Sequence, residues 1–348
     1  MRLFAATLVL FSHCYPLLGI DRQEPLRELT GYVAGGGIAV AIFFTISGYL
    51  VTASLHASAG LTDFFLKRAL RIFPGLVVVV VLTAFVLGPA VTSLSLSGYF
   101  RSEVTYSYLF NALLLIHFPL PGVFADLPHA GGVNGSLWTL PVEAGMYVSL
   151  AVLGMLGMLR RRFVTWIAVA SLGAFAILDN EPWGKTLAVW RLGHAIEFAR
   201  FGTFFFAGAA LYQFRDAVPW RLGVALIMIV LWVSTFRTAF GIYVMFVAVA
   251  YLTIYLGRSS NRLFTGFGRF GDFSYGIYIY AFPVQQSLLE VIGWNMRPMV
   301  FFFVALGATL CFASLSWHLI EHPFLQLKHR LISVGARPAP ELNSSDLS

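Results

Sequence analysis

Arg2 and His13 lie eleven residues apart in the first apolar segment of the chain, RLFAATLVLFSHCYPLLGI. In a helix, which advances about 1.5 Å per residue, that separation returns to the same face roughly 16 Å further along the axis. An ionisable group at membrane depth costs on the order of several kcal/mol unless it is paired or hydrated, so such groups usually face a functional cavity. We therefore expect one helix face to carry both a cation and a titratable base, and His13 is the first candidate for catalysis.

A second group of candidates, Ser136, Trp138 and Glu143, begins the fourth apolar segment. Glu143 and His13 each lie about seven residues from the outer end of their segments, so we expect them at similar depths. A neutral imidazole can accept a hydroxyl proton, and a buried carboxylate can hold the correct tautomer. Ser136 and Glu143 would lie nearly on one helix face, with Trp138 near the entrance to a substrate site. The simpler alternative is that His13 and Glu143 are only hydrogen-bonded inside a bundle.

Arg68 and Arg71 lie three residues apart in LTDFFLKRALRIFPG, a connection that would place them side by side on an amphipathic helix. Guanidinium pairs suit phosphate or pyrophosphate groups. We therefore predict that Arg2, Arg68 and Arg71 bind an anionic cytosolic cofactor, with Arg2 at the same cytoplasmic edge. The alternative is that the arginines only anchor the connection at the membrane surface.

The composition is that of an integral membrane protein, because 58% of the 348 residues are hydrophobic and only 11% are charged. Long apolar stretches favour an all-α bundle over a membrane barrel. The net charge of +7 fits clusters at segment ends better than a nucleic-acid surface. Cys14 and Cys311 show neither metal-like spacing nor an indication of a disulfide, so no metal is expected.

Length and hydropathy predict about ten spans, with both termini in the cytoplasm. Residues 104–118 are apolar but short, and we expect a re-entrant or interfacial segment there, since the basic clusters then fall on one side. The prolines and glycines of 93–135 predict ordered turns that form a lid over the bundle. The expected spans are 2–20, 33–55, 72–92, 136–159, 163–179, 198–214, 219–236, 239–257, 273–292 and 298–320.

Two apolar segments carry residues that suit helix packing. Ser47 and Gly48 lie inside a span, where glycine permits close helix approach and serine can bond across helices. Pro283 predicts a broken helix at 273–292.

The expected domain boundary falls at 325, with 326–348 forming a cytoplasmic tail whose small polar residues predict disorder.

Taken together, these segments resemble the acyltransferase-3 family of membrane acyltransferases, over about residues 1–325 and in the family's order. The chain departs from the family at Ala281, where many members have a histidine before phenylalanine-proline. The matching residues are Arg2 and His13; Ser47 to Leu50; Arg68 and Arg71; Ser136, Leu137, Trp138 and Glu143; Ser274, Tyr275, Tyr278, Phe282 and Pro283; and Glu321 and Pro323.

The resemblance implies transfer of an acyl group, commonly acetyl from acetyl-CoA, to hydroxyls of sugars or other acceptors at a bacterial inner membrane. It implies that His13 is the essential catalytic residue and that the arginines handle the donor. We expect acyl-CoA as a substrate rather than a permanently bound cofactor, with a cell-surface or exported glycan as acceptor. Direct transfer and a transient acyl-histidine both remain open. A transporter or flippase using Arg2, His13 and Glu143 as an ion path is the alternative from another class, and an inactive scaffold is a third.

Overall fold

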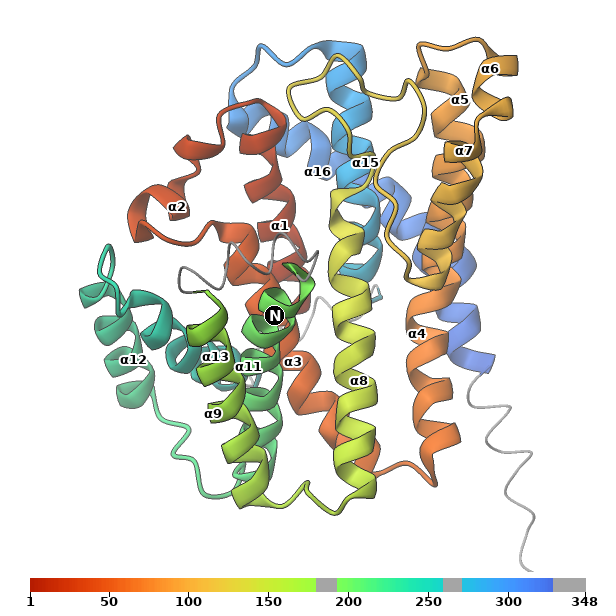
Figure 1. Ribbon diagram of the computed structural model, residues 1–348. Helices are drawn as coiled ribbons and strands as arrows, with labels where there is room; N and C mark the ends of the chain where they lie inside the picture. Colours follow the sequence, from red (N-terminus) through yellow and green to blue (C-terminus); the bar gives the residue numbers. More distant parts are fainter. Residues whose placement is uncertain (180–192, 259–270, 328–348) are drawn as a thin grey trace, which may run out of the picture.

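The computed structural model describes residues 1–179, 193–258 and 271–327 (Figure 1). Over these ranges the regular structure is helical, apart from one isolated bridge between Thr92 and Val123. A helix lies at each of the ten expected ranges. These helices are α1 (Arg2–Leu17), α3 (Gly35–His56), α4 (Leu61–Leu82), α8 (Thr139–Met155), α9 (Arg161–Leu178), α11 (Gly193–Gln213), α12 (Leu222–Ser234), α13 (Gly241–Arg258), α15 (Ser274–Ile292) and α16 (Pro298–Ser316).

The expectation of a helical membrane bundle is confirmed, whereas the count of ten spans is not established. Among the described residues, six helical stretches are long and apolar enough to cross a membrane. The other four helices, α1, α11, α12 and α15, are shorter or more polar. The six stretches are Gly35–His56, Leu61–Val91, Gly135–Met155, Arg161–Leu178, Gly241–Arg258 and Pro298–Leu327.

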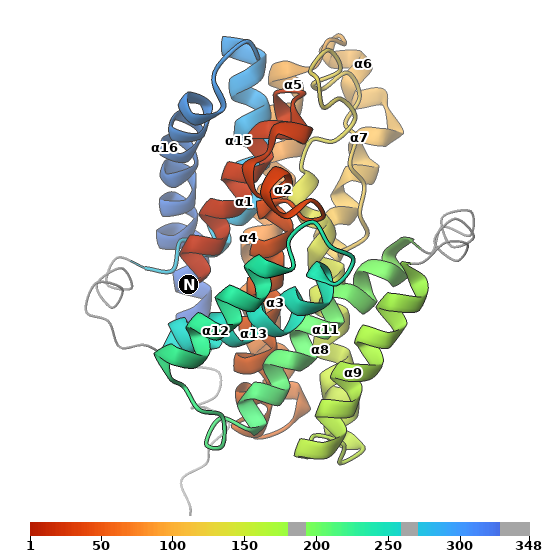
Figure 2. The same ribbon diagram turned by 90° about the vertical axis from the view of Figure 1, so that its left-hand side faces the viewer.

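Helix α3 forms the centre of the bundle and packs against α1, α11 and α13. Its residues are apolar on every side, the pattern of a helix that is buried all round. On the far side of α1 lie α15 and α16, while α9 packs on α11 (Figures 1 and 2). The bundle thus brings α1, α3 and α15, three helices with candidate functional residues, into direct contact.

A pair of glycines brings α3 and α11 into backbone contact. A Cβ atom at Gly48 would lie 1.8 Å from the carbonyl oxygen of Phe205, and one at Gly208 would lie 2.1 Å from that of Thr45. Neither position has room for a side chain. The prediction that Gly48 serves close helix packing is confirmed.

Helix α4 differs from the sequence prediction. We expected a separate amphipathic connection before a span at 72–92, but α4 begins at Leu61 and continues through a π-helical turn, Thr83–Leu87, into α5 (Gly88–Val91). Arg68 and Arg71 therefore lie within one long helix, two to three turns from its start.

Helix α15 is continuous through Pro283, so the prediction of a broken helix is wrong. A proline has no N–H to donate to the carbonyl four residues earlier, which here belongs to Ile279. The side-chain amide of Asn134 donates to that carbonyl instead, at 2.8 Å. Because another segment satisfies the free carbonyl, the helix does not have to break.

The predicted non-spanning segment 104–118 folds as α7 (Glu103–Ser107), the 3₁₀ helix η3 (Tyr108–Leu113) and an irregular stretch. With α6 (Leu96–Arg101), it lies at the end of the bundle opposite the turns 57–60 and 156–160 (Figure 1). Two short elements, η1 (Asp21–Gln23) and α2 (Pro25–Thr30), connect α1 to α3.

The amino end of α1 lies about half-way along the bundle in both views (Figures 1 and 2), not at its edge as we expected for Arg2. Arg2 therefore lies near the middle of the bundle's length, with its side chain 33% exposed. The predicted orientation also relies on a basic cluster that includes Arg262 and Arg269, and these two residues lie outside the described residues, as do 328–348 of the predicted tail.

Candidate active site

The first of two neighbouring cavities, here called the arginine cavity, has a volume of about 400 Å³. Side chains from α1, α3, α4, α8 and α15 line it. Four basic side chains and two carboxylates face it, so its lining carries an excess of positive charge. These six residues are Arg2, Lys67, Arg68, Arg71, Glu143 and Asp272.

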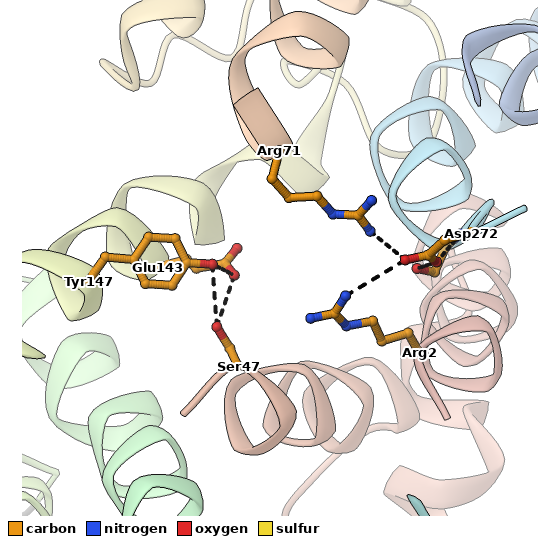
Figure 3. A network of polar contacts seen from close by, with 7 residues as sticks. Arg2, Ser47, Arg71, Glu143, Tyr147 and Asp272 are labelled. Carbon is orange, nitrogen blue, oxygen red and sulfur yellow. Dashed lines mark hydrogen bonds and ion pairs between the residues drawn. The ribbon is translucent and has the colours of Figure 1, made fainter. Parts of the chain in front are cut away.

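Asp272 connects two of the arginines (Figure 3). Its Oδ2 accepts a 2.6 Å hydrogen bond from Arg71 and lies 3.7 Å from an Arg2 nitrogen. Ser274 donates both its hydroxyl and its backbone N–H to Oδ1. Burial raises the pKa of Asp272, but Arg71, the Ser274 hydroxyl and Arg2 outweigh it and hold that pKa below its usual value. Asp272 is therefore a carboxylate that holds two guanidinium groups side by side.

Glu143 lies on the opposite wall of the arginine cavity (Figure 3). It accepts hydrogen bonds from the hydroxyls of Tyr147, one turn along α8, and Ser47 of α3, the latter at 3.2 Å. The guanidinium of Arg68 lies 6.0 Å from the centre of the Tyr147 ring. The bond between Ser47 and Glu143 confirms that this serine bonds across helices, and it fixes α8 to α3 beside the arginines.

The second cavity, here called the histidine cavity, has a volume of about 320 Å³ and contains His13, Ser136 and Trp138. Three of its lining residues have a buried atom without a hydrogen-bond partner in the described structure: His13 Nδ1, Ser136 Oγ and Arg200 Nε. The Trp138 ring packs on Phe201, which also lines this cavity. Because buried polar atoms are normally paired, the unused capacity here suits a polar ligand.

The cavities divide the predicted site residues into two groups. Arg2, Arg68, Arg71 and Glu143 share the arginine cavity, while His13, Ser136 and Trp138 share the histidine cavity. No hydrogen bond joins Glu143 to His13 within the described part of the chain. Ser136 lies in a 3₁₀ turn, η4 (Gly135–Trp138), rather than on the α8 face of Glu143. The hypothesis that Ser136 and Glu143 lie on one helix face is therefore wrong.

Sequence reasoning missed Asp272, Tyr147 and Arg200 as site residues. Tyr147 lies four residues after Glu143, a helix spacing that brings side chains together, so its contact was recognisable. Asp272 and Arg200 are charged residues beside or inside apolar segments, a signal in its own right. Nothing in their spacing, however, indicates which helix they would face.

Comparison with known proteins decides the family. The family model Acyl_transf_3, described as an acyltransferase domain, matches residues 1–318. The chain belongs to this acyltransferase family. It is 33% identical to the O-acetyl transferase of Shigella phage Sf6 over 332 residues, which cover 93% of this chain and 94% of that protein.

A second relative of this acyltransferase is Nodulation protein 10 of Rhizobium leguminosarum bv. viciae. The two are 30% identical over 364 residues, covering 96% of this chain and 94% of that protein. No solved structure matches the chain. The family, the similarity to an O-acetyl transferase and the apolar helices together identify a multi-pass membrane O-acyltransferase.

Proposed function

We propose that this enzyme transfers an acyl group, acetyl in the first instance, from acyl-CoA in the arginine cavity to a glycan hydroxyl in the histidine cavity. The observation that carries the proposal is the division itself. Residues of the types that bind phosphate gather in one cavity. A histidine whose ring Nδ1 has no hydrogen-bond partner among the described residues lies in the next. The name of the phage relative supports acetyl as the group transferred.

The arginine cavity supplies what a phosphorylated donor needs. Arg2 and Arg71 are held side by side by Asp272, and Arg68 has a buried Nε without a hydrogen-bond partner in the described structure. Guanidinium groups bind phosphate oxygens through paired, charge-assisted hydrogen bonds. An arriving phosphate group would compete with Asp272 for Arg2 and Arg71, and Arg68 is available to it directly.

The histidine cavity suits an acceptor with several hydroxyls. The Ser136 hydroxyl, which has no partner among the described residues, can bond to an acceptor hydroxyl, and Trp138 offers an aromatic ring. The carboxylates of Asp21 and Glu24 already accept bonds from Arg27 and Gly35, and their remaining lone pairs can accept further ones. These are the residue types with which proteins hold sugar rings. Ser136 and Trp138 would therefore bind the acceptor, with His13 at the hydroxyl to be acylated.

In the direct mechanism, His13 accepts the proton of the acceptor hydroxyl while the hydroxyl oxygen attacks the thioester carbonyl carbon. An ester bond forms, the carbon–sulfur bond breaks, and the thiolate of CoA leaves and takes the proton back from the imidazolium. In the alternative mechanism, an imidazole nitrogen attacks first and the acceptor then receives the acyl group from His13. Glu143 supports the donor side, where it holds Tyr147 and Ser47, instead of contacting His13.

The deciding experiment measures transfer of radiolabelled acetyl from acetyl-CoA to lipid-linked glycans in proteoliposomes. Wild type should produce alkali-labile label on the glycan, and His13→Ala should lower the rate at least 100-fold, within the range of general-base catalysis. The matched control is His318→Ala, which removes an exposed histidine. Equal rates for wild type and His13→Ala would overturn the proposed role. Rapid-quench trapping of labelled His13 would select the acyl-histidine route.

A further inference from the structure

The arginine and histidine cavities are separated by a thin wall whose residues face both sides. Tyr278 of α15 and Val40 of α3 line each of the two cavities. The Tyr278 hydroxyl shares a 2.5 Å hydrogen bond with the hydroxyl of Thr139, at the start of α8. Thr139 in turn lines the arginine cavity. We call these three residues, Val40, Thr139 and Tyr278, the septum.

Aromatic packing holds Tyr278 and extends the wall. Phe43, which lines the arginine cavity, packs edge-on against Tyr278 with ring centres 5.5 Å apart. Beside it, Phe44 on the arginine side stacks on Phe201 on the histidine side. The tyrosine ring is nearly buried, at 8% exposure, and its hydroxyl has its partner in Thr139. Tyr278 is thus held in one orientation at the boundary that the two cavities share.

The proposed reaction requires an opening at this place, because donor and acceptor would occupy different cavities. We propose that Tyr278, held by Thr139, is the residue that controls passage of the acyl thioester and sets the size of the acyl group transferred. This inference rests on the proposed function. The thioester carbonyl must reach the boundary to meet the acceptor hydroxyl, so the acyl chain must fit beside Tyr278 and Val40. A small acyl group needs less displacement of the ring than a long one does.

A closed septum also keeps water away from the thioester. Polar atoms of the histidine cavity that have no partner among the described residues can bind water, and in the proposed reaction the septum separates that water from the thioester. Tyr278→Ala should therefore raise hydrolysis of acetyl-CoA relative to transfer and lower the preference for acetyl over hexanoyl donors at least tenfold. Unchanged donor preference in folded Tyr278→Ala would overturn the size-selecting role.

Two milder variants test the hydrogen bond itself. Tyr278→Phe and Thr139→Val each remove it while keeping the shape of the wall. Both should raise the ratio of hydrolysis to transfer by the same factor, and the double variant should raise it no further, as expected for two partners of one interaction. Tyr280→Phe is the matched control, since that ring packs on Phe312 of α16. Additive effects of the two single variants would contradict the proposal that Thr139 acts by holding the Tyr278 hydroxyl.

Chemical labelling tests the septum independently of any acyl transfer. Ser47→Cys, in a protein whose own Cys14 and Cys311 are replaced by serine, places a single thiol in the arginine cavity. A membrane-impermeant maleimide is then added to proteoliposomes of either orientation. With Tyr278 present, the thiol should be labelled from one face only; with Tyr278→Ala, it should be labelled from both. Labelling from both faces with Tyr278 intact, or from one face only in Tyr278→Ala, would contradict the proposal that Tyr278 separates the two cavities. If Ser47→Cys labels as expected but the wild type transfers nothing from acyl-CoA, the proposed function is rejected while the septum is upheld.

Discussion

Asp272 determines how Arg2 and Arg71 are presented to a ligand. Without a carboxylate between them, two guanidinium groups in one cavity would repel each other. Asp272 removes that repulsion and also orients Arg71 through a 2.6 Å hydrogen bond. The residue lies just before an apolar span and belongs to none of the motifs recognised in the sequence, yet the geometry of the proposed donor site depends on it.

Replacing Arg71 should weaken donor binding specifically. We expect Arg71→Gln to raise the KM for acetyl-CoA roughly tenfold or more, because a charge-assisted hydrogen bond contributes about 1.5–3 kcal/mol. The effect on kcat should be smaller, since a contact to the phosphate end is made in ground and transition states alike. Steady-state kinetics would measure both. Arg258→Gln, at a residue bonded to Tyr49, is the control; a fall in kcat alone for Arg71→Gln would contradict a donor-binding role.

The lowered pKa of Asp272 predicts how stability depends on pH. Because the folded-state pKa lies below the unfolded value of about 4, the ionised carboxylate stabilises the folded protein above that value. The contribution is lost as the pH falls through the folded-state pKa. Thermal unfolding of wild type and Asp272→Asn should therefore differ most above about pH 5, and the difference should shrink toward pH 3. A difference in Tm that stays constant over this range would exclude the ion pair as its origin.

At the scale of helices, packing is best tested at the close contact between α3 and α11. Gly48→Ala would place a methyl group against the backbone of Phe205, where no flexible side chain can move aside. We expect a loss of about 1–3 kcal/mol or more in the free energy of unfolding, as for other overpacked sites. Unfolding in detergent would measure it. Gly173→Ala on α9 meets open space and should be neutral or slightly stabilising; equal effects at both glycines would refute the close contact.

The second helix-scale prediction concerns the proline in α15. Asn134→Ala removes the donor to the Ile279 carbonyl, which should cost about 1–3 kcal/mol for an unsatisfied buried group. Restoring a backbone N–H with Pro283→Ala should reduce that cost. The comparison is a double-mutant cycle on unfolding free energies, and the same loss in both backgrounds would show that Asn134 acts elsewhere.

At the scale of the whole molecule, hydropathy predicted where the helices lie, because long apolar runs must be helical in a membrane. The motifs predicted which residues gather, and Arg2, Arg68 and Arg71 do line one cavity. The sequence could not predict that these arginines and His13 line different cavities, because that depends on the depth at which α1 begins. It also could not predict the 3₁₀ turn that moves Ser136 off the face of α8. Both are properties of tertiary packing, not of residue spacing.

Two hydrogen bonds join α15 to the first residue of α8 and to the segment just before it, and they bear on the speed of the reaction. Asn134 bonds to the Ile279 carbonyl, and Thr139 bonds to the hydroxyl of Tyr278, the preceding residue of α15. On the other side, α3 is fixed to α11 by its glycine contact. If Tyr278 controls acyl passage, as proposed above, a wall between two such braced units would open by rotation of the phenol ring instead of by sliding of helices, which takes microseconds to milliseconds. Acyl passage would then be quick compared with a typical turnover, and chemistry or product release would set the pace.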